Sequence, residues 1–93
     1  MEIKFVIYYH PVVVNKDIPG LTNPWKQKIK KAIEDKSATN PYHYGKPLRR
    51  SLVGYRKLRV GDYRVIFRID KNKIIILAIM NRRDIYKKVH RRI

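Results

Sequence analysis

The stretch YRKLRVGDYRVIFRI, residues 55–69, decides the expected fold. Two runs that alternate between apolar and polar residues flank Gly61-Asp62, a dipeptide typical of tight turns. We therefore predict a β-hairpin with strands over residues 55–60 and 63–69. Alternation gives the second strand two unlike faces. One face carries Tyr63, Val65, Phe67 and Ile69, and the other carries Arg64, Ile66 and Arg68.

Further elements are predicted on both sides of this hairpin. Residues 74–80 are apolar at every position, as expected of a central strand that is covered on both faces. A turn at residues 70–72 joins them to the hairpin. Residues 2–9 alternate and predict another strand, whereas residues 83–92 predict a short basic helix.

Two helices are predicted between the first strand and the hairpin. Residues 11–17 form a short one. The longer helix spans about three turns and begins with Asn23 as N-cap and Pro24 as the first helical residue. Its apolar stripe consists of Trp25, Ile29 and Ile33. We interpret Trp25 as a core anchor, and we expect residues 36–54 to be a loop.

Together these elements predict a single α+β domain over residues 1–93. The expected sheet is small, with about four strands that are antiparallel apart from a mixed edge. Two N-terminal helices cover one face, and a short C-terminal helix completes the fold. The opposite face must be covered by another part of the chain or used for binding.

Net charge is the strongest global feature of the sequence. Twenty-three Lys and Arg against seven Asp and Glu give +16 at pH 7. Residues 46–93 hold sixteen basic and three acidic residues, including all ten Arg. Because the planar arginine fork matches phosphate, this bias indicates a polyanionic partner: nucleic acid first, an acidic protein second and an anionic membrane third. A merely solvated basic surface is the alternative.

Other classes of protein and site are disfavoured. The chain has no cysteine, and its longest apolar run, residues 74–80, is far too short to span a membrane. The start of the sequence lacks signal-peptide features, so we expect a soluble cytoplasmic protein. No glycine-rich phosphate loop is present, and metal-ligand spacing is absent among His10, His43 and His90. We expect neither a metal nor another cofactor.

The basic side chains of the hairpin are the candidates for a phosphate-binding site. If the strands pair so that the polar sets share a face, four cations line one concavity: Lys57, Arg59, Arg64 and Arg68. Ordinary solvent-facing alternation is the competing interpretation. Five tyrosines lie among the charges and could stack on RNA bases: Tyr42, Tyr44, Tyr55, Tyr63 and Tyr86. We expect Tyr63 in the core and Tyr86 at the surface.

Three segments carry a resemblance to a known family. Residues 55–69 resemble the central hairpin of RelE/ParE-type toxins, and residues 45–49 resemble the approach to its first strand. The string NRRDIY, residues 81–86, resembles their C-terminal motif, commonly Gly-His-Arg-Arg-Asp/Glu-aliphatic-Tyr. The order of elements fits across nearly the whole chain. The resemblance implies the toxin of a type II toxin–antitoxin system.

Within that superfamily, the sequence is most similar to RelE-like messenger RNA interferases. The resemblance implies a ribosome-dependent endoribonuclease, in which the 2′-hydroxyl attacks the adjacent phosphate without a metal. The product is a 2′,3′-cyclic phosphate or its opened form. The implied partners are the ribosome, messenger RNA and an acidic, partly disordered antitoxin, with no membrane and no small-molecule cofactor.

The resemblance also implies roles for individual residues. By position, Lys57 resembles the base that helps to deprotonate the nucleophile, and Arg64 resembles the arginine that stabilises the pentavalent phosphate. Arg82 resembles the leaving-group arginine, with Arg83 as a substitute, and Tyr86 resembles the tyrosine that positions the substrate. The expected catalytic residues are thus Lys57, Arg64, Arg82 and Tyr86. The expected RNA-binding residues are Arg56, Arg59, Arg68 and Arg83.

One departure and two other functions stay open. Met80-Asn81 stands where many relatives have Gly-His, and asparagine is not a useful proton donor. The chain then relies on Arg82 and Tyr86, has reduced activity, or carries an introduced attenuating substitution. The alternatives to the nuclease are a ParE-like DNA gyrase inhibitor and a plain basic RNA-binding module. Joint retention of the four expected catalytic residues favours the nuclease.

Overall fold

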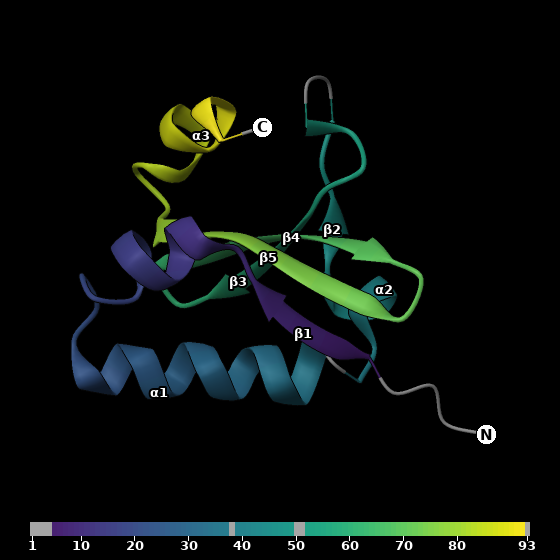
Figure 1. Cartoon of the computed structure of the whole chain (residues 1–93), viewed down its shortest axis with the longest axis horizontal. Coiled ribbons are helices and arrows are strands. Elements are labelled where there is room, and N and C mark those ends of the chain that lie inside the picture. Colours follow the sequence, from purple (N-terminus) through teal and green to yellow (C-terminus); the bar gives the residue numbers. More distant parts are fainter. Residues whose placement is uncertain (1–4, 38, 50–51, 93) are drawn as a thin grey trace.

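Five strands form one sheet in the computed structural model, which describes residues 5–37, 39–49 and 52–92 (Figure 1). The strands are β1 (Val6–Tyr9), β2 (Lys46–Pro47), β3 (Arg56–Val60), β4 (Tyr63–Asp70) and β5 (Lys73–Asn81). Their order across the sheet is β1-β5-β4-β3-β2. β1 runs parallel to β5, and every other neighbouring pair is antiparallel.

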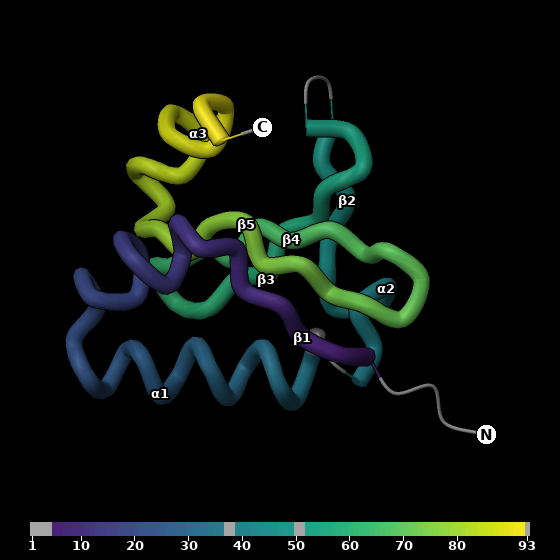
Figure 2. The backbone as a smooth tube through the Cα atoms, viewed as in Figure 1, coloured from purple at the N-terminus to yellow at the C-terminus, as the bar shows by residue number. Residues whose placement is uncertain are grey.

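Helical segments lie on both faces of this sheet. They are the wide turn η1 (Val13–Asp17), α1 (Asn23–Ala32) with its extension η2 (Ile33–Ser37), α2 (Pro41–Tyr44), and α3 (Ile85–Lys88) followed by η4 (Val89–Arg91). The backbone trace places α1 and α3 on opposite sides of the sheet (Figure 2). Among the described residues, no helix has the length and apolar character needed to cross a membrane.

The predicted hairpin is confirmed as β3 and β4. Its register pairs Arg59 with Arg64, and Val60 with Tyr63 across the two-residue turn. Gly61 in that turn has a φ of 58°, and a Cβ there would lie 2.6 Å from a ring atom of Trp25. Backbone conformation and close packing therefore both require glycine. The Trp25 ring also lies 4.8 Å from that of Tyr63, which confirms Trp25 as a core anchor.

The predicted central strand is β5, which contributes to two separate cores. The first lies on the α1 side and consists of Val13, Leu21, Ile29, Ile33, Leu58, Val65, Phe67, Ile74, Ile76 and Ile79. The second lies beneath α3 and consists of Leu52, Ile66, Leu77, Ala78, Met80, Ile85 and Val89. The face that the sequence left open is thus covered in part by the C-terminal helices.

A β-bulge in β5 divides its residues between these cores. Ile66 pairs with Ala78 whereas Phe67 pairs with Ile76, so Leu77 is an extra residue in β5. The extra residue lets both Leu77 and Ala78 join the second core. Ile79 then returns to the first core.

The α+β class is confirmed, with differences in detail. The sheet has five strands rather than about four, because β2 forms within residues 36–54, which were expected to be a loop. The helix α2 forms in the same segment. β2 is only two residues long, and just beyond it the Leu48 N–H donates to Tyr55 O at 3.0 Å. α1 begins at Asn23 with Thr22 as N-cap, one residue earlier than predicted. Of the first predicted strand, residues 2–4 lie outside the described residues.

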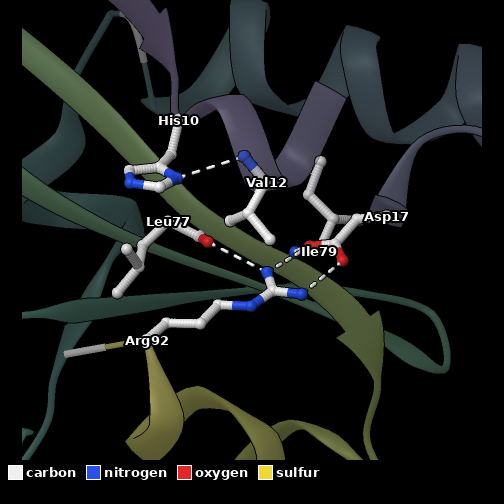
Figure 3. Close-up of polar contacts among 6 residues, drawn as sticks. All are labelled: His10, Val12, Asp17, Leu77, Ile79 and Arg92. Atoms are coloured by element: carbon white, nitrogen blue, oxygen red, sulfur yellow. Dashed lines mark hydrogen bonds and ion pairs between the residues drawn. The ribbon is translucent and has the colours of Figure 1, made fainter. Parts of the chain in front are cut away.

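A buried ion pair joins η1, β5 and the segment after η4 (Figure 3). Both guanidinium Nη atoms of Arg92 donate to the Asp17 carboxylate at 2.7 Å. The side chains are 14% and 5% exposed, respectively. Asp17 Oδ2 also accepts from the Ile79 backbone N–H at 2.8 Å, and Leu77 O accepts from Arg92 at 3.1 Å. The pair thus provides hydrogen-bond partners for the Ile79 N–H and the Leu77 carbonyl on the edge of β5, beyond the point where β1 ends.

This arrangement predicts unequal costs for its two partners. Asp17→Ala should lower the free energy of unfolding by about 3 kcal/mol, because it leaves a buried guanidinium without its counter-ion and the Ile79 N–H without an acceptor. Arg92→Ala should cost less, about 2 kcal/mol, because Asp17 keeps its bond to Ile79. The exposed neighbour Arg91 is the control, and its change to alanine should stay within about 0.5 kcal/mol. Urea denaturation measures the stability of all three variants. Equal losses of unfolding free energy in Asp17→Ala and Arg91→Ala would contradict a stabilising role for the buried ion pair.

Candidate nucleic-acid interface

A basic pocket of about 210 Å³ opens on the sheet face that also carries α3. Its lining consists of Tyr44, Lys46, Lys57, Arg59 and Arg64. Strand register explains this gathering, since Lys46 pairs directly with Lys57 on the neighbouring strand, and Arg59 with Arg64. Four cations and a phenol therefore surround one small concavity. This lining suits an anion.

Arg64 is held in place by the turn that follows β3. Its Nη1 donates to the backbone carbonyls of Gly61 at 2.8 Å and Tyr63 at 2.9 Å. No described residue accepts from its Nε or Nη2. A guanidinium that is fixed on one side and open on the other is preorganised to bind an oxyanion.

Tyr86 reaches this site from α3, which follows the last strand of the sheet. Lys57 Nζ donates to the Tyr86 hydroxyl at 2.9 Å and lies 5.7 Å from the ring centroid. Tyr86 is exposed, as predicted, although its neighbours Ile85 and Val89 are buried in the second core. Packing of α3 on the sheet therefore places the phenol beside the lysine.

The remaining C-terminal candidates lie beside the β3–β4 turn. Arg82 donates its backbone N–H to Asp62 O at 2.8 Å, and its side chain lies 3.9 Å from the Asp62 carboxylate. Both side chains are more than half exposed, so this pair is weak and easily separated. The backbone N–H of Arg83 donates to Asn81 Oδ1 at 3.0 Å. Asn81 therefore caps the turn into α3.

Of the four predicted RNA-binding residues, Arg59 lines the pocket, whereas Arg56, Arg68 and Arg83 do not. Arg68 shares a face with Arg64 but lies four residues further along β4, roughly 13 Å away. Buried Ile66 separates them, so the expected concavity of four hairpin cations is wrong for Arg68. Arg56 leaves the opposite face of β3, because alternation places it with Leu58. It donates to Gly45 O at 2.8 Å instead.

Two pocket residues were not among the predicted site residues. Lys46 lies in a segment that was expected to be a loop, and its register with Lys57 exists only because β2 forms. Tyr44 was recognised among the aromatic residues that lie between charges, but it was not assigned to the site. The likeness of residues 45–49 to the approach to a strand was the available signal for Lys46.

A second, larger cavity of about 330 Å³ is a poor candidate for chemistry. It lies in the first core, and its lining consists of Tyr9, Ile18, Leu21, Lys26, Ile29, Lys30, Ile33 and Ile79. Burial and the negative charge of Glu34 raise the pKa of the Tyr9 phenol, so this group stays neutral. Within the described residues, no three His, Asp or Glu side chains are grouped so that they could hold a metal ion.

Sequence comparison assigns the family. A sequence model described as "ParE toxin of type II toxin-antitoxin system, parDE" matches residues 4–86. The chain belongs to the ParE toxin family. Two curated toxins from Mycobacterium tuberculosis are also similar over 50 residues: Toxin RelG at 44% identity and Toxin RelE at 42%. These matches cover 52% of this chain, and 58% and 52% of the two relatives.

Solved structures agree with this assignment. The Mycobacterium tuberculosis toxin–antitoxin complex RelBE2 contains a chain that matches with a TM-score of 0.79 at 26% identity, over 85% of this chain and 99% of that one. The YoeB–YefM complex from Staphylococcus aureus matches with a TM-score of 0.59 at 22% identity, over 82% and 94%. The second likeness supports the fold alone. The predicted RelE/ParE toxin superfamily is confirmed.

The pocket geometry predicts selective binding of inorganic phosphate. At constant ionic strength, phosphate should raise the melting temperature of the wild type, because a ligand that binds the folded state stabilises it. Arg64→Ala should lose most of this increase, since it removes the preorganised guanidinium. Arg68→Ala removes the same charge outside the pocket and should keep it. Equal losses in both variants would attribute phosphate binding to net charge.

Proposed function

We propose that this ParE-family chain is a ribosome-dependent endoribonuclease that cleaves messenger RNA. The observation that carries the proposal is the basic pocket, in which Lys57 and Arg64 lie together and Tyr86 contacts Lys57. Its lining is cationic and contains no carboxylate, so it favours a phosphodiester. The similarity to Toxin RelG and Toxin RelE supports this choice.

The proposed reaction is an internal transesterification. The 2′-oxygen of the ribose bonds to phosphorus while the bond from phosphorus to the 5′-oxygen of the next nucleotide breaks. Lys57 is the proposed acceptor of the 2′-hydroxyl proton, and Tyr86 holds that lysine in place. Arg64 binds the equatorial oxygens, where negative charge develops. A proton from solvent completes the leaving hydroxyl.

Arg82 is proposed to stabilise the charge that develops on the leaving oxygen. It begins from a position beside Asp62, and the exposed pair is weak enough to open when RNA arrives. Asn81 takes no part in proton transfer, since its side-chain oxygen caps the turn into α3. The proposed site therefore relies on Arg82 and Tyr86 in place of a histidine.

The messenger RNA, the ribosome and an antitoxin are the proposed partners. The solved relatives named RelBE2 and YoeB–YefM are toxin–antitoxin complexes. We propose that this chain likewise binds an antitoxin, and that the partner is acidic and partly disordered. The reason is the net charge of +16, which an acidic segment that folds on contact would neutralise.

Inhibition of DNA gyrase is the second candidate function. The name of the matching family model favours it, because the resemblance to ParE-like toxins implies a gyrase inhibitor without nuclease chemistry. Such an inhibitor needs no preorganised phosphate site. The turn carbonyls that fix Arg64 are therefore the feature that favours the nuclease.

Arg64 provides the sharpest test of the nuclease. Arg64→Ala should slow single-turnover cleavage on programmed ribosomes by about a hundredfold or more, as loss of an oxyanion donor does elsewhere. Ribosome binding, measured separately, should weaken far less, because many cations share it. Arg68→Ala is the matched control and should cleave within a few-fold of the wild type. Intact messages with the wild-type protein, together with stalled gyrase–DNA complexes, would support the gyrase candidate instead.

Cleavage should also proceed without a transition metal. Four cations line the proposed site and would repel a metal ion, so the protein's own groups must stabilise the developing charge. The assay keeps magnesium constant for the ribosome and adds a chelator that is selective for zinc and other transition metals. Cleavage rates should not change. A loss of activity that added zinc or manganese restores would refute the proposed mechanism.

A further inference from the structure

One wall of the basic pocket comes from the short connection between α2 and β2. Tyr44 ends α2, and Lys46 begins β2. Both line the pocket, and the Tyr44 side chain is 43% exposed. The mechanism proposed above uses Lys57, Arg64 and Tyr86, so it assigns no task to this wall.

The backbone of this connection is held in place by contacts of Gly45 with its surroundings. A Cβ at Gly45 would clash with the Phe67 ring and lie 2.8 Å from the Pro41 carbonyl oxygen, so the chain approaches the first core as closely as glycine allows. Gly45 N–H donates to that same carbonyl at 3.0 Å. From the opposite face of the sheet, Arg56 donates to Gly45 O and lies 5.0 Å from the Tyr42 ring. Arg56 is thus a positioning residue for the wall.

Tyr44 itself is poorly covered by the rest of the protein. The His43 ring meets it edge-on at 4.8 Å between centroids, and Lys36 Nζ lies 5.9 Å from its centroid. The pocket beside it holds about 210 Å³, below the range of roughly 300–1,000 Å³ that is typical of drug-sized ligands. One flat ring with an attached phosphate fits this space and its charge. A nucleotide in single-stranded RNA has those parts.

We propose that Tyr44 is the platform on which an RNA base stacks, and that Lys46 binds a phosphate adjoining that nucleotide. This inference rests on the proposed RNA-cleaving function of the pocket and adds a source of base preference to it. Aromatic stacking tolerates every base but favours the larger purine surface. Tyr44 therefore selects a purine beside the scissile phosphate, whereas the cations bind any sequence.

Binding of a fluorescent RNA tests the platform without requiring cleavage. The probe is a single-stranded hexamer that contains 2-aminopurine, whose emission is quenched when the base stacks. Wild type and Tyr44→Phe should bind and quench it alike, because both keep an aromatic ring. Tyr44→Ala should weaken the quenched complex roughly five- to a hundredfold, the range found when one stacking residue is removed. Circular dichroism melting verifies that each variant is folded.

Tyr8 supplies the matched control. It is 48% exposed and has Lys73 Nζ 5.5 Å from its centroid, but it lies on β1, outside the pocket lining. Tyr8→Ala should bind and quench like the wild type. No quenching with the wild-type protein, or equal quenching with Tyr44→Ala, would overturn the inference.

Cleavage then separates this inference from the proposed function. Programmed ribosomes carry messages that differ by a purine or a pyrimidine at one position next to the cleavage site. The wild type, Tyr44→Phe and Tyr8→Ala should prefer the purine, and Tyr44→Ala should cleave both messages at similar rates. Stacking without cleavage would refute the nuclease and leave the platform intact. Cleavage with an unchanged base preference in Tyr44→Ala would refute the platform and leave the nuclease intact.

Discussion

The whole domain depends on burial of β5 from both sides. This strand pairs with β1 on one edge and β4 on the other, and it supplies side chains to both cores. The bulge at Leu77 makes this possible, because it turns two consecutive side chains toward the second core before Ile79 returns to the first. Where β1 ends, the Asp17 carboxylate and the Arg92 guanidinium satisfy the free edge of β5. Both helical layers are thereby fastened to one strand.

The same alternation that builds the first core also builds the basic pocket. In β4, Val65 and Phe67 face α1 and are fully buried, so Arg64 must leave the other face. Register with β3 and β2 then adds Arg59, Lys57 and Lys46 beside it. Folding therefore concentrates positive charge whose mutual repulsion opposes the folded state. A bound polyanion would relieve that repulsion, so binding and stability should be linked in this family member.

Placement of Tyr86 couples the second core to the site. Ile85 and Val89 lie one turn apart on the C-terminal helices and pack on Ile66, Ala78 and Met80, which directs Tyr86 away from the core. Its hydroxyl then meets Lys57, 29 residues earlier in the chain. Asn81 contributes by capping the turn that starts this segment. Asn81 thus has a structural role at the start of the C-terminal segment.

Local sequence determined the hairpin, the apolar central strand, the amphipathic helix and the family, because each depends on short-range periodicity or on a contiguous motif. The family resemblance also predicted Lys57, Arg64 and Tyr86 as site residues, and the fold brings these three side chains together. The sequence predicted a mixed edge, but tertiary structure alone decided that β1 and β5 form it, and it alone decided the bulge, the two-residue β2 and the exclusion of Arg56 and Arg68 from the pocket. Periodicity assigns a residue to a face, but it does not specify the partner strand, the register or what covers that face. Those depend on packing between segments that are distant in the chain, and this packing places Lys46 opposite Lys57 and buried Ile66 between Arg64 and Arg68.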